Sequence, residues 1–195
     1  ILSLLIDVYI VVNYLSLHPP IPTADNQLFW IRMVMMLTSF ISPVTLLLVH
    51  TFPNEHIRMK RLPLLLIGLL ALSSGTASTT SLVFQALEYP GGHPIPIPGP
   101  AIPLFFLDFV GLFLVSFGIL ISRYRHQINK ERGKYLYLLL GTIISFSLTS
   151  FFTVIMVVIF KNSDFVIFGP LSPVILMAFI AYAIVRYGLF DIKTI

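Results

Sequence analysis

Residues 165–187 read FVIFGPLSPVILMAFIAYAIVRY, an apolar run whose one charged residue, Arg186, lies beside its end. A helix needs about 20 mostly apolar residues to cross the hydrocarbon core of a bilayer, so this run predicts a membrane-spanning helix. The chain of 195 residues is 57% hydrophobic and 10% charged, whereas soluble domains carry about 25% charged residues. Too little polar surface remains to cover a soluble core, so the sequence predicts an integral membrane protein.

The rest of the chain repeats this pattern in further apolar runs of similar length, with a shorter run at its start. The sequence shows no segments of alternating hydrophobicity about ten residues long, which mark a membrane β-barrel. We therefore predict an all-α fold, a polytopic transmembrane helix bundle that forms a single domain over residues 1–195. The predicted spans are residues 1–17, 28–50, 63–87, 101–122, 135–160 and 165–187.

The basic residues are distributed unevenly between the loops that join these spans. Loops 51–62 and 123–134 and the C-terminal tail hold ten of the 12 Lys and Arg residues, whereas loops 18–27, 88–100 and 161–164 hold only Lys161. The positive-inside rule therefore predicts that the basic loops and the C-terminus are cytoplasmic. The opposite loops, including the Pro-rich stretch EYPGGHPIPIPGPAIP at 88–103, are then expected outside.

The Pro-rich stretch favours an extended polyproline-type segment without internal hydrogen bonds. Two interpretations stay open for it. It is either a stiff lid over the outer mouth of the bundle or a plain rigid connector.

Few ionisable groups lie within the predicted spans, and such groups mark sites or paired contacts by default. Asp7, Arg32 and Asp108 are placed in the outer half by the predicted orientation, together with Asn13 and Gln85. One hypothesis is a polar pocket that binds a small or amphipathic signal, with Arg32 facing Asp108 or Asp7. The alternatives are an Arg–Asp pair that only fixes helix register, and an Arg32 side chain that snorkels to the interface.

Prolines and small residues predict local features of the helices. Pro43, Pro170 and Pro173 remove backbone hydrogen bonds and are expected to kink their spans. The small residues of SSGTASTTS, 73–81, and Gly141 in the fifth span predict close helix packing.

No motif in the sequence points to catalysis. Cysteine is absent, which excludes thiolate chemistry and cysteine metal sites. No two histidines form an HxxxH or HExxH pair, and no GxSxG, P-loop or dinucleotide fingerprint is present. We predict no enzyme activity in this chain, no metal, no cofactor and no nucleic-acid partner.

The end of the chain carries a resemblance. Residues 170–192, PLSPVILMAFIAYAIVRYGLFDI, resemble the last membrane helix and exit of the seven-helix sensor domain at the N-terminus of many bacterial sensor histidine kinases. That family's last span closes with an AYAI-(aliphatic)-(basic or aromatic)-LFDI pattern. The basic loop 123–134 with its following helix and HTFPNE, 50–55, are also similar. The matching residues at the exit are Ala181, Tyr182, Ala183, Ile184, Arg186, Leu189, Phe190, Asp191 and Ile192.

The resemblance implies a membrane-embedded signal-input domain of a two-component sensor in a bacterial inner membrane. It implies seven spans, of which six are present and one would precede Ile1. Residues 188–195 would then begin a cytoplasmic signalling linker to a kinase or other output domain, or to a partner subunit. Whether the domain forms a homodimer is left open by the resemblance. The residues expected to couple the signal are Pro170, Pro173, Arg186, Leu189, Phe190 and Asp191.

Two rival interpretations remain at this point. The chain is either a non-catalytic accessory subunit that contacts lipid or pigment within a larger complex, or a small transporter or channel. A transporter would need polar residues through both leaflets, and the inner half of the predicted spans is apolar apart from Ser and Thr.

Overall fold

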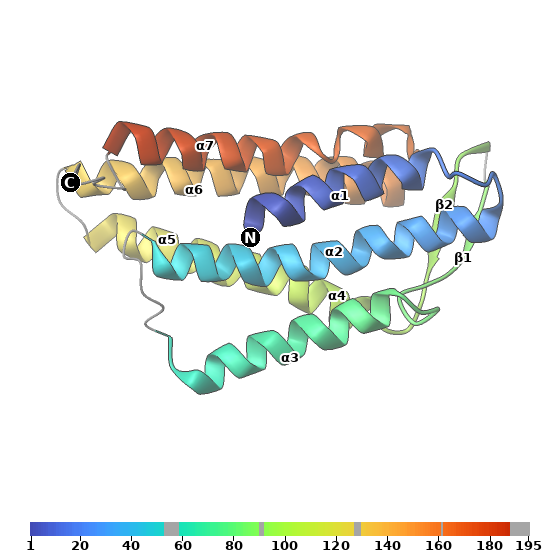
Figure 1. Ribbon diagram of the computed structural model, residues 1–195, viewed down its shortest axis with the longest axis horizontal. Helices are drawn as coiled ribbons and strands as arrows, with labels where there is room; N and C mark the ends of the chain where they lie inside the picture. The colour runs from blue at the N-terminus through green and yellow to red at the C-terminus, as the bar shows by residue number, and fades with distance from the viewer. Residues whose placement is uncertain (53–58, 90–91, 127–129, 161, 188–195) are drawn as a thin grey trace.

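The computed structural model describes residues 1–52, 59–89, 92–126, 130–160 and 162–187, and within them helices predominate. The chain forms an elongated bundle with the helices along its length (Figure 1). In chain order the elements are α1 (Leu2–Leu17), α2 (Ala24–Thr51), α3 (Arg61–Ser78), β1 (Phe84–Glu88), β2 (Ile95–Pro98), α4 (Ile102–Phe106), the π-helix η2 (Leu107–Gly111), α5 (Leu112–His126), α6 (Lys130–Thr149), the π-helix η3 (Ser150–Ile159), the 3₁₀ helix η4 (Asp164–Phe168) and α7 (Leu171–Tyr187).

The structure has five helical segments long and apolar enough to cross a membrane, within the described residues. They are Ala24–Thr51, Arg61–Ser78, Ile102–His126, Tyr135–Val157 and Asp164–Arg186, and the apolar helix Leu2–Leu17 is shorter. The predicted helical membrane bundle is confirmed. The exact spans across a bilayer remain a prediction.

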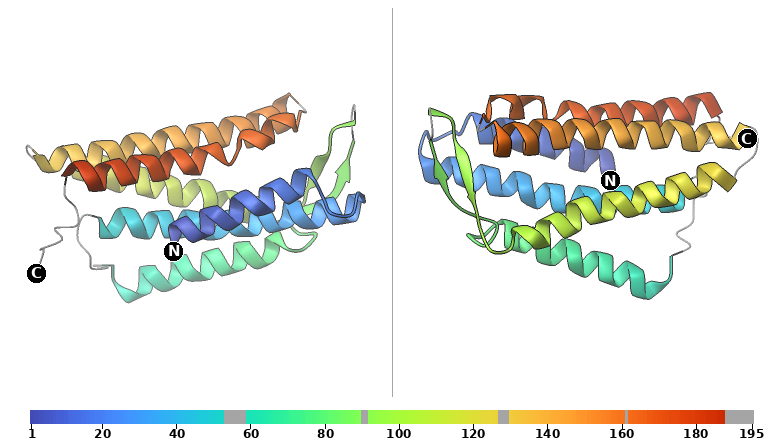
Figure 2. Two further views of the ribbon diagram at one scale, coloured as in Figure 1. Left: turned by 45° about the horizontal axis from the view of Figure 1, so that its top comes forward. Right: turned by 180° about the vertical axis from the view of Figure 1, so that it is seen from behind.

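The two ends of the bundle differ in structure. The β1–β2 hairpin lies at one end, beside the α1–α2 turn and the segment between η3 and α7 (Figures 1 and 2). We call this the hairpin end. At the opposite end lie the last turn of α2, the first turn of α3, and the last turns of α5 and α7. The loops that the sequence predicts outside thus gather at the hairpin end, and the basic loops lead off the other.

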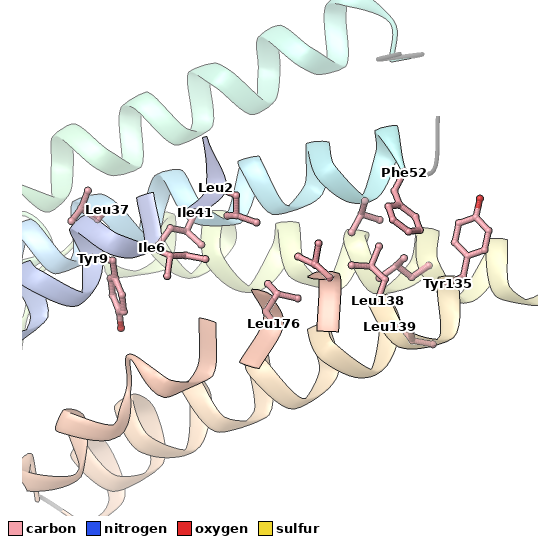
Figure 3. Packing of buried hydrophobic residues seen from close by; sticks show 13 residues of the cluster. Leu2, Ile6, Tyr9, Leu37, Ile41, Phe52, Tyr135, Leu138, Leu139 and Leu176 are labelled. Atoms are coloured by element: carbon pink, nitrogen blue, oxygen red, sulfur yellow. The ribbon is translucent and has the colours of Figure 1, made fainter. Parts of the chain in front are cut away.

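A hydrophobic core joins five of the helices along their length. Leu176 of α7 and Leu138 of α6 are buried against residues of α1 and α2, and the rings of Phe52 and Tyr135 meet edge to face at 5.9 Å (Figure 3). Close approach of α6 and α7 needs Gly141, because a Cβ there would lie 2.6 Å from Cβ of Phe179. The close helix packing predicted at Gly141 is therefore possible because glycine has no side chain.

The third predicted span, 63–87, differs from the structure at its second half. Helix α3 ends at Ser78, and residues 84–88 form strand β1 instead. Hydroxyl groups explain the stop: Thr79 Oγ1 and Thr80 Oγ1 donate to the carbonyls of Thr76 and Ala77, and Thr80 Oγ1 accepts from the amide of Leu82. Such local side-chain bonds compete with helix continuation.

The kinks predicted in the last span are corrected by the structure, and the kink at Pro43 stays a prediction. In the last span a break replaces the kink, since η4 and α7 are separated at Gly169 and Pro170. Pro173 lies in the first turn of α7, where a missing amide proton removes no helix bond. Pro43 alone lies inside a long helix, α2, and is buried there.

Candidate functional site

Arg32 on α2 holds the first strand of the hairpin. Its Nε and Nη2 atoms donate to the carbonyl oxygen of Phe84 at 3.1 and 2.7 Å, and Nη2 also lies 3.4 Å from the carbonyl oxygen of Gln85. Among the described residues no ion pair joins Arg32 to a carboxylate. The predicted pairing of Arg32 with Asp108 or Asp7 is therefore wrong, since backbone carbonyls receive the guanidinium instead.

The hairpin needs such support because its second strand is poor in donors. Strand β2 reads Ile-Pro-Ile-Pro, and its prolines are opposite Phe84 and Leu87 in the antiparallel register. Proline has no amide proton and cannot donate to the ladder. The predicted polyproline-type segment is thus extended, but it is paired with β1.

Side chains at the rim fix the hairpin to its neighbours. The hydroxyl of Tyr89 lies 3.1 Å from Oε1 of Gln27, and Nε2 of Gln27 donates to the carbonyl oxygen of Ser16 at 3.2 Å. Nδ1 of His93, in the loop that joins β1 to β2, lies 2.9 Å from Oδ1 of Asp164 in η4. The hairpin is therefore connected to α1, α2 and η4 together.

Beneath the hairpin is a cavity of about 480 Å³. This volume is within the usual range of small-molecule sites, about 300–1,000 Å³. Residues of α1, α2, the hairpin, α4, η2, α6, η3 and η4 surround it. The lining residues are Tyr9, Asn13, Ser16, Leu17, Gln27, Ile31, Val34, Met35, Thr38, Phe84, Pro94, Ile95, Pro96, Pro98, Ile102, Phe105, Phe106, Phe109, Thr149, Thr153, Val157, Ser163 and Val166.

The described lining residues share one property, which is that none of them is charged. Most of the side chains are apolar, the polar ones are neutral amides and hydroxyls, and none of the described lining residues is Asp, Glu, Lys, Arg or His. Two π-helical segments, η2 and η3, contribute to the wall through Phe109, Thr153 and Val157. Interruptions of this kind are frequent at functional sites.

The predicted binding residues do not all meet in this cavity. Asn13 lines it and is buried. Arg32 and Gln85 belong to the attachment of the hairpin, and Asp7 is exposed on α1. Asp108 is fully buried on η2, near Ser39 of α2 and Ser74 of α3, and is not part of the lining.

Several lining residues escaped the sequence analysis. Ser16, Gln27 and Thr149 are polar residues near the hairpin-end termini of their helices. Their shared position at one end of successive spans is the signal that could have found them.

The predicted coupling residues are divided between described and undescribed parts of the chain. Pro170 precedes α7, Pro173 lies in its first turn, and Arg186 is exposed in its last turn. Leu189, Phe190 and Asp191 lie outside the described residues. A direct link joins the cavity to α7, because Thr149 lines the cavity and its Oγ1 lies 2.6 Å from Oγ of Ser172.

Fold and site together define a multi-pass helical membrane domain with an uncharged cavity beneath a hairpin that Arg32 holds to α2. The chain matches the family model described as the N-terminal 7TM region of histidine kinase over residues 1–193, and it belongs to that family. It matches no curated protein and no solved structure. The chain is therefore a membrane sensor region of the histidine-kinase type.

Proposed function

We propose that this domain senses an uncharged, mainly apolar small molecule that enters the cavity beneath the hairpin. The observation that carries the proposal is the lining itself: a cavity of about 480 Å³ with neutral amides and hydroxyls and no charged group among its described residues. A charged ligand would lose its hydration there without a partner, which is costly. A ligand with an apolar body and one or two hydroxyl or carbonyl groups matches both kinds of lining residue.

The ligand would enter from outside the cell or from the outer leaflet. The distribution of Lys and Arg supports this orientation, since ten of the 12 lie in loops and a tail that lead off the end opposite the hairpin. On this proposal the domain resides in the inner membrane of a bacterium, with its basic loops and C-terminus in the cytoplasm.

The signal would leave through α7. Ligand contact with Thr149 would shift the hydrogen bond to Ser172 at the first turn of α7. That helix packs along α6 and ends at the opposite side of the bundle, where a kinase output module would receive its movement (Figure 2). The ligand shifts the output only as far as it binds the two arrangements of α7 unequally.

Filling the cavity provides the test. Val34→Phe places a larger side chain into the cavity from the long helix α2, and Leu69→Phe makes a comparable change on the exposed face of α3. Three probes with the same chain length are compared in lipid nanodiscs: 1-decanol, decanoate and decylammonium. We expect decanol to raise the unfolding temperature of the wild type and of Leu69→Phe, and to have no such effect on Val34→Phe. The charged probes, decanoate and decylammonium, should not stabilise the protein through this cavity.

The sensor role has its own readout. In the protein that carries its kinase module, Val34→Phe is expected to change autophosphorylation, whereas Leu69→Phe keeps the wild-type level. Equal responses to decanol in all three proteins would refute the cavity as the binding site. Unchanged autophosphorylation in Val34→Phe would refute its coupling to output.

A further inference from the structure

Asp108 is a buried carboxyl group that the proposed sensing mechanism does not use. It lies in the π-helix η2 with none of its surface exposed. Its carboxyl group is close to the hydroxyls of Ser39 on α2 and Ser74 on α3. Neither carboxyl oxygen reaches hydrogen-bonding geometry with any described residue. A charge at the centre of a membrane helix costs about 2.5–3.5 kcal/mol on insertion scales, so this group needs a partner or a neutral form.

The two serines are neutral and have other hydrogen-bond partners besides Asp108. Oγ of Ser39 donates to the carbonyl oxygen of Met35 at 3.1 Å, and Oγ of Ser39 and Oγ of Ser74 lie 3.0 Å apart. A hydroxyl carries a single proton. When Ser39 donates to Met35, Ser74 can donate to Ser39 in the serine pair. In that arrangement both hydroxyls present lone pairs to Asp108, and a carboxylic acid that donates a proton fits these surroundings.

Among the described residues, no basic group is placed to neutralise an ionised Asp108. The elements packed against η2 are α2, α3, α4, α5 and, through the ring contact of Phe109 with Phe146, α6, whose charged and tyrosine residues all lie in its first eight positions. Arg32 of α2 is bonded to the hairpin, and Arg123 of α5 donates to carbonyls in the last turn of α2. Helix α4 has no titratable group, and the other titratable groups of α2, α3 and α5 lie in terminal turns: Asp25, His50, Arg61, Tyr124, Arg125 and His126.

We propose that Asp108 is a proton-binding site that stabilises the packing of η2 against α2 and α3. The acid form is held while the three elements are in contact. When they separate and water enters, the proton passes to water and the carboxylate becomes hydrated. Neighbouring Phe109 lines the cavity, and so does Met35, whose carbonyl accepts from Ser39. The proton site is thus directly behind the cavity wall, and its occupancy is linked to the position of that wall.

The infrared spectrum of the protein in lipid nanodiscs provides a direct test. At neutral pH we expect a carbonyl stretching band of a protonated carboxyl group, lost in Asp108→Asn and retained in Asp7→Asn. The asparagine keeps the size and neutrality of the acid, and Asp7 is a carboxyl on the exposed face of a helix. No such band in the wild type would overturn the proposal. A band that disappears when sodium replaces choline would also overturn it, since Asp108 would then hold a cation.

Stability against pH gives a second test that does not depend on the spectrum. A folded chain that holds one more proton than the unfolded chain loses stability as pH rises, at most tenfold in the folded-to-unfolded ratio for each pH unit. We expect the wild type and Asp7→Asn to show this loss as pH rises from mildly acidic to neutral, above the range in which a carboxyl group of the unfolded chain releases its proton. The slope should be absent in Asp108→Asn. Identical slopes in the wild type and Asp108→Asn would contradict a proton held by Asp108.

Discussion

Replacing Arg32 by glutamine should release the hairpin from α2. The guanidinium makes two donor contacts to the carbonyl oxygen of Phe84, at 3.1 and 2.7 Å, and a longer one to Gln85. A hydrogen bond to a charged group contributes about 1.5–3 kcal/mol. These contacts share two acceptors and are only partly buried, so we take about 2 kcal/mol for the whole set. Since 1.4 kcal/mol corresponds to a factor of ten, the open hairpin should become about 30-fold more populated.

The small sheet itself resists this change weakly. An isolated two-stranded hairpin is marginal in water, and two of the four residues of β2 are prolines without an amide proton. Amide hydrogen exchange in nanodiscs, followed by mass spectrometry, measures the opening directly. In Arg32→Gln the amides of 84–88 should exchange about 30-fold faster.

Arg123 provides a matched control for this experiment. Its guanidinium also donates to backbone carbonyls, those of Val49, His50 and Phe52, but at the opposite end of α2. Arg123→Gln should therefore accelerate exchange in the last turn of α2 and leave the hairpin unchanged. If Arg32→Gln leaves 84–88 as protected as in the wild type, the guanidinium does not hold the strand, and the reasoning from its contacts fails.

Two further changes test the helix packing and the rim. Gly141→Ala forces a Cβ to within 2.6 Å of Cβ of Phe179, so it should destabilise the protein by about 1–3 kcal/mol in denaturant unfolding. Gly68→Ala, where nothing lies within 4 Å, should have no such cost, and equal effects would contradict close contact of α6 and α7. At the rim, His93 and Asp164 have side chains 39% and 64% exposed. A double-mutant cycle should give a coupling below about 1 kcal/mol, and a larger value would show that this pair dominates the attachment of the hairpin.

Hydropathy and charge predicted the general architecture because they depend on composition along the chain. Apolar runs predicted the helical bundle, and the family match confirms that class. The same measure failed at 79–88, because Leu82, Val83 and Phe84 continue the apolar run of α3 while the chain turns back as a strand. The turn depends on hydroxyl bonds of Thr79 and Thr80 to nearby backbone groups, which a hydropathy window does not detect.

Arg32 shows why the site was harder to predict than the fold. Sequence reasoning seeks a carboxylate for a buried guanidinium, because side chains are what a sequence displays. In the structure Arg32 donates to carbonyl oxygens of the backbone. Every residue has such an oxygen, so the sequence alone does not show which of them lies near the guanidinium. Asp108 is thus left without the expected arginine, buried beside two neutral serines. The predicted Arg32–Asp108 pair is therefore two separate features with different chemistry. Arg32 is a cation that holds the hairpin, and Asp108 is a carboxyl group whose buried surroundings favour the acid form.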